Sequence, residues 1–140
     1  MKLKQTKSYA MHALMYMVRH TTQLPVTTRA IAKAEGIPYR QLVNLFGLLE
    51  EAGIIRKAEH SEPGYVFKKS PSEVTLLEIF ETIEGGPIFN ECFLDYCDCQ
   101  AKPTDCEIYA TWKKATTVIK KKLSEVTLED AAWRHPEHYF

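Results

Sequence analysis

Two short amphipathic segments that meet at Gly36 constrain the fold of this chain more than any other feature. Thr27 opens the first, because its hydroxyl can accept a hydrogen bond from the free amides of a helix start, and Gly36 is a natural helix end. Pro38 then starts a second helix that ends at Gly53. Its apolar residues recur at helical spacing and form one face, made of Leu42, Leu45, Phe46 and Leu49. Two short helices joined by a glycine turn are the sequence form of a helix-turn-helix.

The segments on either side extend this unit. Residues 8–20 carry apolar side chains at helical spacing and predict a helix that precedes the turn. Residues 54–57 and 65–68 favour β-structure, and the polar segment between them ends in Pro63-Gly64. They predict a two-stranded hairpin, which is the wing of a winged helix-turn-helix.

Two further helices are predicted after the wing. Residues 72–86 hold the first, with Thr75 and Glu78 at the spacing of a capping box. The second follows Cys106, and its apolar seam suits a partner helix: Ile108, Trp112, Ala115, Ile119, Leu123 and Val126. The expected fold is mainly α, a winged helix-turn-helix with a two-stranded wing plus a long C-terminal dimerisation helix. We expect four segments: a DNA-binding domain (1–86), a cysteine-containing sensor loop (87–106), a dimerisation helix with its extension (107–131) and a tail (132–140).

Charge is distributed unevenly along a chain whose net charge is zero. Residues 1–69 carry 11 lysines and arginines against 5 glutamates, whereas residues 70–140 carry 7 against 13 acidic residues. The basic half can supply the sequence-independent attraction to phosphate on which DNA affinity depends. No apolar run approaches the roughly 18 residues that a bilayer requires, so we expect a cytoplasmic protein with no membrane partner.

The start of the second helix of the turn is where base edges are expected to be contacted. Tyr39, Arg40 and Gln41 occupy it, and arginine and glutamine can pair with guanine and adenine through two hydrogen bonds each. The alternative is that they are ordinary solvated residues. Basic and hydroxyl side chains elsewhere are candidates for phosphate contacts. These are Thr28, Arg29, Lys2, Lys4 and Lys7, together with Arg56, Lys57, Lys68 and Lys69 at the base of the wing.

All four cysteines lie in one short stretch, at Cys92, Cys97, Cys99 and Cys106. A chain with enough apolar residues for a core does not need disulfides, so metal or redox chemistry is the better explanation. Thiolates commonly hold iron-sulfur clusters. Zinc ribbons use pairs of cysteines two to four residues apart, a spacing that only Cys97 and Cys99 approach, so zinc is the weaker candidate.

Several motifs occur in a characteristic order: residues 9–14, 31–32, 36–37, then Leu42, Leu45, Phe46 and Leu49, residues 52–55, 63–65, 74–77 and 83–85, the cysteine segment, Leu123 and residues 126–130. Together they resemble the Rrf-two family of bacterial winged-helix regulators, which includes the iron-sulfur regulator (IscR) and nitric-oxide sensor (NsrR) branches.

The resemblance implies a homodimer joined through the helix that contains Trp112, which binds a roughly palindromic operator on double-stranded DNA and most often represses transcription. In cluster-binding members three loop cysteines are ligands, and they map onto Cys92, one of Cys97 or Cys99, and Cys106. The fourth ligand varies, and Ser8 and Tyr109 stand at two positions that supply it in other members. His12, one turn after Ser8, is a further candidate, against the alternative of an ordinary helix histidine. The extra cysteine could instead complete a set of four thiolates, formed by Cys92, Cys97, Cys99 and Cys106.

The leading interpretation is therefore a DNA-binding regulator whose operator affinity is controlled by an iron-sulfur cluster, of two-iron or four-iron type, or by the redox state of the cysteine loop. One alternative is a cluster-free regulator that uses a thiol switch. Another is a zinc-stabilised interaction module without a DNA target. An enzyme is disfavoured, because the sequence has no phosphate-binding glycine loop and no nucleophile with a recognisable base.

Overall fold

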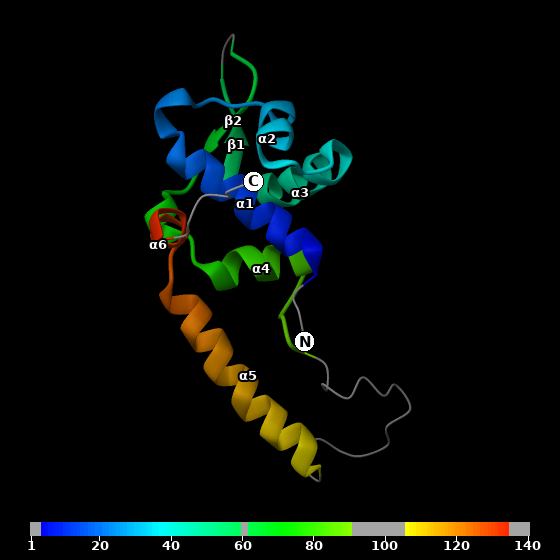
Figure 1. The fold of residues 1–140 in the computed structure, drawn as a ribbon. Helices are drawn as coiled ribbons and strands as arrows, with labels where there is room; N and C mark the ends of the chain where they lie inside the picture. Colours follow the sequence, from blue (N-terminus) through cyan, green and yellow to red (C-terminus); the bar gives the residue numbers. More distant parts are fainter. Residues whose placement is uncertain (1–3, 60–61, 91–105, 135–140) are drawn as a thin grey trace.

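The computed structural model describes residues 4–59, 62–90 and 106–134 and confirms a mainly helical winged-helix fold (Figure 1). Along the chain the elements are α1 (Gln5–Arg19), η1 (Thr21–Gln23), α2 (Thr28–Glu35), α3 (Tyr39–Glu51), β1 (Ile55–Lys57), β2 (Tyr65–Phe67), η2 (Pro71–Glu73), α4 (Leu76–Glu84), α5 (Glu107–Glu125) and α6 (Leu128–Arg134). None of these helices is long and apolar enough to span a bilayer.

The helix-turn-helix forms as its capping residues predict. The Thr27 hydroxyl accepts a hydrogen bond of 3.1 Å from the amide of Ala30 and so caps α2. Gly36 ends α2 in the left-handed region at φ 67°, and the amide of Ile37 donates to the carbonyl of Ala32. On α3 the expected apolar face is buried, at Leu42, Leu45, Phe46 and Leu49.

Helix α1 lies at the centre of the core. It begins at Gln5, three residues earlier than expected, and contacts α2, α3, α4 and α6. Ala10, Ala13, Leu14 and Met17 on this helix are fully buried. Because α3 packs against this central helix, the buried side of α3 is fixed and its opposite side faces outward.

The wing is a short antiparallel hairpin in which Ile55 pairs with Phe67. It is tied to the loop before α2, because the backbone groups of Val26 and Tyr65 exchange hydrogen bonds of 3.2 and 2.8 Å. Gly64 makes this approach possible. Its φ is +126°, and a Cβ at this position would lie 2.7 Å from the backbone of Val26.

Replacing Gly64 with alanine is therefore expected to destabilise the protein, by about 1–3 kcal/mol from backbone strain alone. Thermal unfolding measures the loss. Gly86→Ala is the matched control, because no atom lies within 4 Å of the Cβ it would add. Equal melting temperatures for the two variants would contradict the close approach of Val26.

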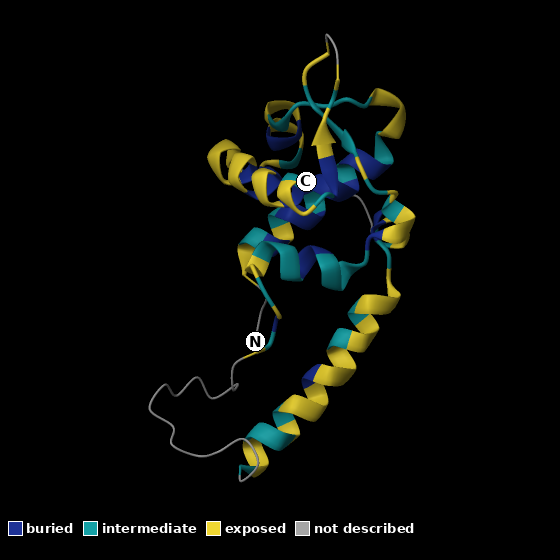
Figure 2. Cartoon of the chain, turned by 180° about the vertical axis from the view of Figure 1, so that it is seen from behind, coloured by how far each residue is buried: buried dark blue, intermediate teal, exposed yellow. Residues whose placement is uncertain are grey.

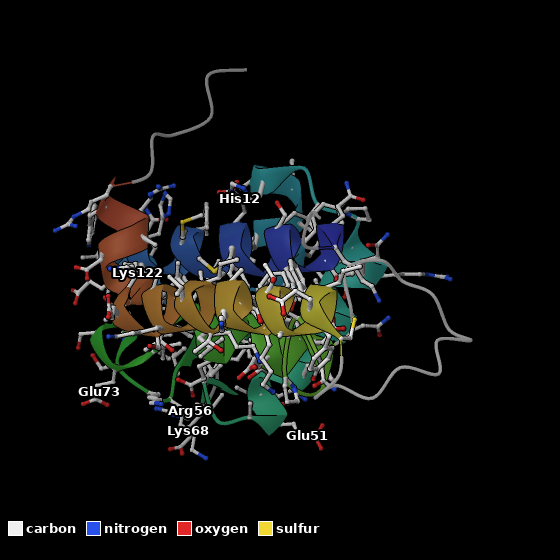
Figure 3. The ribbon with its side chains drawn as sticks, turned by 90° about the horizontal axis from the view of Figure 1, so that it is seen from below. His12, Glu51, Arg56, Lys68, Glu73 and Lys122 are labelled. Carbon is white, nitrogen blue, oxygen red and sulfur yellow. The ribbon has the colours of Figure 1, made fainter. Side chains whose placement is uncertain are left out.

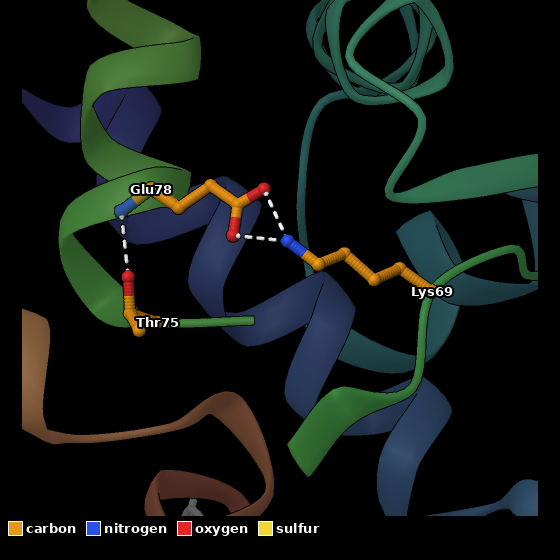
Figure 4. A network of polar contacts seen from close by, with 3 residues as sticks. All are labelled: Lys69, Thr75 and Glu78. Atoms are coloured by element: carbon orange, nitrogen blue, oxygen red, sulfur yellow. Dashed lines mark hydrogen bonds and ion pairs between the residues drawn. The ribbon is translucent and has the colours of Figure 1, made fainter. Parts of the chain in front are cut away.

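Helix α4 is capped by only half of the expected capping box. The Thr75 hydroxyl accepts a hydrogen bond of 3.1 Å from the amide of Glu78. The Glu78 carboxylate does not return to the cap but receives both bonds of 3.0 Å from Lys69 (Figure 4). Lys69 follows the wing, so the pair connects α4 to the wing strand.

The C-terminal boundaries differ from those expected. Helix α5 ends at Glu125, where Val126 becomes extended and its carbonyl accepts a hydrogen bond from Leu76. Thr127 then caps a separate helix, α6, through the amide of Asp130. The residues expected to begin a tail continue this helix to Arg134, because Leu128 and Ala132 are buried in the core. The assignment of residues 132–134 to a tail was wrong.

Helix α5 extends away from the rest of the molecule (Figure 1). Its C-terminal end joins α6, whereas its start lies at the far end of the molecule. Figure 2 shows that most of its residues are exposed.

Candidate nucleic-acid interface

The three residues expected to read bases lie at the start of α3. Tyr39, Arg40 and Gln41 are all exposed and begin the helix. Val43 and Asn44, one turn further on, are exposed as well and were missed by sequence reasoning. Their spacing of three and four residues from Arg40 is the signal that could have found them.

Arg29 and Tyr39 form a stacked pair that joins the first turns of α2 and α3. The Arg29 guanidinium carbon lies 4.3 Å from the centre of the Tyr39 ring, a cation–π geometry. The ring is therefore engaged with Arg29. The nitrogen atoms at the edge of the guanidinium can still donate to a phosphate.

A cleft of about 600 Å³ lies between the start of α2, the start of α3 and the wing. Its lining includes four expected DNA-contacting residues, namely Thr28, Arg29, Tyr39 and Lys57. Thr28 and Arg29 are the first residues of α2, where backbone amides lack helical partners. The Glu62 carboxylate lines it too, and the two cations and the helix start still leave the cleft suited to a phosphate group.

Tyr65 also lines this cleft. Burial raises the pKa of Tyr65, and the nearby Glu50 carboxylate raises the pKa further. Its ring packs edge-on against Phe46 of α3, with 5.1 Å between centres. Tyr65 therefore connects the cleft to the buried side of α3.

At the base of the wing, Arg56, Lys57 and Lys68 are exposed. Figure 3 shows Arg56 and Lys68 on the same side of the molecule as Glu51, at the end of α3. These cations stay candidates for phosphate contacts. Lys69 stays a candidate as well, with its ammonium group paired to Glu78 on a side chain that is 38% exposed.

The N-terminal lysines differ from one another. Lys2 lies outside the described residues, and Lys4 is exposed at the start of α1. Lys7, in contrast, is buried and lies 2.6 Å from a carboxylate oxygen of Glu84. The expectation of a phosphate contact was wrong for Lys7, because its charge is already paired in the interior.

Of the four cysteines, only Cys106 belongs to the described residues; Cys92, Cys97 and Cys99 lie outside them. Cys106 caps α5, and its sulfur accepts a hydrogen bond of 3.4 Å from the amide of Tyr109. Within the part of the chain that the structure describes, no group of three metal-binding side chains occurs. The ligand set thus stays a prediction.

His12 is half-buried on α1, and Figure 3 shows it on the side opposite Arg56 and Lys68. The start of α5, next to Cys106, lies at the end of the molecule remote from α1 (Figure 1). Within one subunit, therefore, His12 and Cys106 do not approach each other. A site that used both would need α1 of one copy and Cys106 of another.

Comparisons with known proteins agree with this fold. Residues 3–133 match the Rrf2 family, described as an iron-dependent transcriptional regulator. The chain is 25% identical over 128 residues to the transcriptional regulator IscR of Vibrio atlanticus, covering 91% of this chain and 73% of that protein. It is also 25% identical over 130 residues to the protein rrf2 of Nitratidesulfovibrio vulgaris, covering 93% and 86%.

Two solved structures share the fold. That of CymR, the global cysteine regulator of B. subtilis, has a TM-score of 0.78 at 22% identity and covers 97% of this chain and 99% of its own. That of T. potens IscR has a TM-score of 0.75 at 19% identity, with coverage of 99% and 95%. Because the family match spans nearly the whole chain, this protein belongs to the Rrf2 family of DNA-binding transcriptional regulators and is not an enzyme.

Proposed function

We propose that this chain acts in the bacterial cytoplasm as a homodimeric repressor, and that the chemical state of its cysteine segment controls its affinity for an operator. The observation that carries the proposal is the position of α5. This helix leaves the body of the molecule with Cys106 as its cap and with an apolar side exposed. A dimer contact and a sensing cysteine would then share one helix.

The two sides of α5 differ in what they contact. Toward α4, Thr116 is buried, Lys120 lies 3.8 Å from Glu81, and Trp112 packs edge-on against Phe89 with 6.0 Å between ring centres. The neighbouring side exposes apolar residues in succession: Ile108, Ala115, Val118 and Ile119. Val118 alone is 59% exposed. An apolar line of this length on a protruding helix fits the same line of a second copy, because symmetric contacts use one patch twice.

A dimer joined through α5 would determine how the protein binds DNA. A two-fold dimer presents two copies of α3, and such proteins bind two half-sites separated by about one turn of DNA. The exposed start of α3 and the cleft beside it, which Arg29 and Lys57 line, support the assignment of this side to DNA.

Cys106 fits the role of a metal ligand as far as the described residues allow. Its sulfur accepts a hydrogen bond of 3.4 Å from the backbone amide of Tyr109 at the start of a 19-residue helix. Cys106, with Cys92 and Cys97 or Cys99, would hold an iron-sulfur cluster. When bound, such a cluster supplies electron-transfer chemistry and reacts with oxidants. The resemblance to CymR, whose name records cysteine regulation, favours a thiol switch as the second candidate.

Protein purified without oxygen tests both parts of the proposal. We expect iron and sulfide in matching amounts, and binding to duplex DNA that weakens steeply as salt increases. Cys106→Ser should lose most of the iron while keeping its helix content, since serine also caps helices. Thr117→Ala, an exposed change on the same helix, should keep the iron.

The other results are equally informative. Zinc without sulfide would contradict the cluster, and absence of any metal would favour the thiol switch. Wild-type protein that shows no salt-dependent binding to duplex DNA would overturn the DNA-binding proposal itself.

A further inference from the structure

Gly47 lies in the middle of α3, where neither the packing of the subunit nor the backbone conformation requires a glycine. A glycine inside a helix lowers its stability relative to alanine. Here a Cβ would meet no atom within 4 Å among the described residues, and the backbone does not need the left-handed region. The space beside Gly47 is therefore open to something outside the subunit.

Gly47 shares its side of α3 with Arg40, Val43 and Asn44. A helix turns by about 100° per residue, so positions 40, 43, 44 and 47 fall on one stripe. All four residues are exposed, and the stripe lies opposite the buried side of α3. The order along the stripe is a cation, an apolar side chain, an amide and a glycine.

This order matches the chemistry of base edges in the major groove. Arginine pairs with guanine through two hydrogen bonds, asparagine pairs with adenine in the same way, and an apolar side chain contacts the methyl group of thymine. A missing side chain lets the helix axis come closer to the DNA.

The flanking residues mark the limits of the stripe. Tyr39 is stacked under Arg29, and Gln41 points about 100° away from Arg40. Glu51, one turn beyond Gly47, is exposed and carries a negative charge that phosphates repel. The contact therefore covers the first turns of α3 and stops before its end.

We propose that bases are read by the stripe Arg40–Val43–Asn44–Gly47, that Gly47 is the point where α3 comes closest to DNA, and that each half-site contains a guanine followed by A·T pairs. This inference rests on the proposed DNA-binding function and specifies its ligand.

Gly47→Ala tests whether α3 comes closest to DNA at this residue. The change should raise the stability of the protein but lower its affinity for selected DNA. The melting temperature should rise by about 2–4 °C, because alanine favours the helix. Affinity for duplexes selected by the wild-type protein from a random pool should fall about tenfold or more. Affinity for unselected duplex DNA, which depends on phosphate contacts, should stay unchanged. Selected duplexes bound as tightly by the variant as by wild type would overturn the inference.

The assignment of Arg40 to guanine and Asn44 to adenine is tested by selecting duplexes from the random pool with side-chain variants in place of the wild-type protein. Arg40→Ala and Asn44→Ala should each lose preference at one position, by roughly 5- to 150-fold. Lys33→Ala, an exposed change on α2 outside the stripe, is the control and should leave every preference intact. The reverse pattern, in which Gln41→Ala changes a preference and Asn44→Ala changes none, would overturn the stripe. A failure of DNA binding itself would already be visible in the wild-type protein.

Discussion

Replacing Ile119 with glutamate is expected to convert the protein from a dimer to a monomer and to reduce its operator affinity by at least a hundredfold. Ile119 is 38% exposed on the apolar side of α5, so the folded monomer can accept a charge there. In a two-fold dimer the same change would place two carboxylates in one apolar contact, where an unpaired buried charge is strongly unfavourable. Sedimentation equilibrium and titration of operator DNA measure the two effects.

Lys121→Glu is the matched control for this experiment. Lys121 is exposed on α5 and lies two residues from Ile119, on the other side of the helix. The control should remain a dimer. A dimeric Ile119→Glu protein with unchanged operator affinity would contradict the assignment of this side of α5 to a second copy.

The ion pair between Lys7 and Glu84 is expected to dominate stability under acid conditions. Its hydrogen bond and the positive charge of Lys7 lower the pKa of Glu84 below its ordinary value of 4.5. A carboxyl with a lowered pKa adds stability that is fully present above its ordinary pKa and is lost as the pH falls through its pKa in the folded protein. Wild-type stability should therefore decline below about pH 4.5.

Glu84→Gln should cost about 2–3 kcal/mol at pH 7, because it leaves the buried Lys7 ammonium group without a carboxylate. This figure is below the roughly 3–5 kcal/mol of fully buried pairs, since the Glu84 side chain is 37% exposed. Lys7→Met should cost less, because water can solvate Glu84 and methionine fills the space. Both variants should lose the part of the acid dependence that Glu84 supplies.

Urea unfolding at pH 7 and pH 3.5 measures both effects. The result that contradicts the interpretation is a Glu84→Gln protein as stable as wild type at pH 7. Equal acid dependence in wild type and both variants would assign the acid transition to other carboxyl groups.

Most helices of the DNA-binding region could be predicted from residues that are close together in the sequence. Thr27, Gly36 and the apolar face of α3 act through neighbours three to five residues away, so the sequence determines the helices directly. Glu78 departed from its local pattern because a stronger partner, Lys69, lies nine residues away and carries a full positive charge.

Long-range contacts were not predictable in this way. Lys7 is separated from Glu84 by 77 residues, and nothing near it in the sequence indicates burial. Helix α6 is likewise determined by where Leu128 packs, since its apolar residues alone also fit a continuation of α5. On α3, attention to the helix start selected Arg40, which is proposed above to read a base, but passed over Val43 and Asn44, which share its side of the helix.

The junction between α5 and α6 has a consequence for operators. The amide of Leu128 donates to the carbonyl of Val74, and the amide of Leu76 donates to that of Val126, so the end of α5 is attached to the body by a short β-bridge. In a dimer joined through α5, no flexible linker would separate the two copies of α3. The distance and rotational phase between half-sites would then be built into the protein. Such an operator tolerates a changed base between its half-sites but not an added one, because each added base pair rotates the second half-site by about a tenth of a turn.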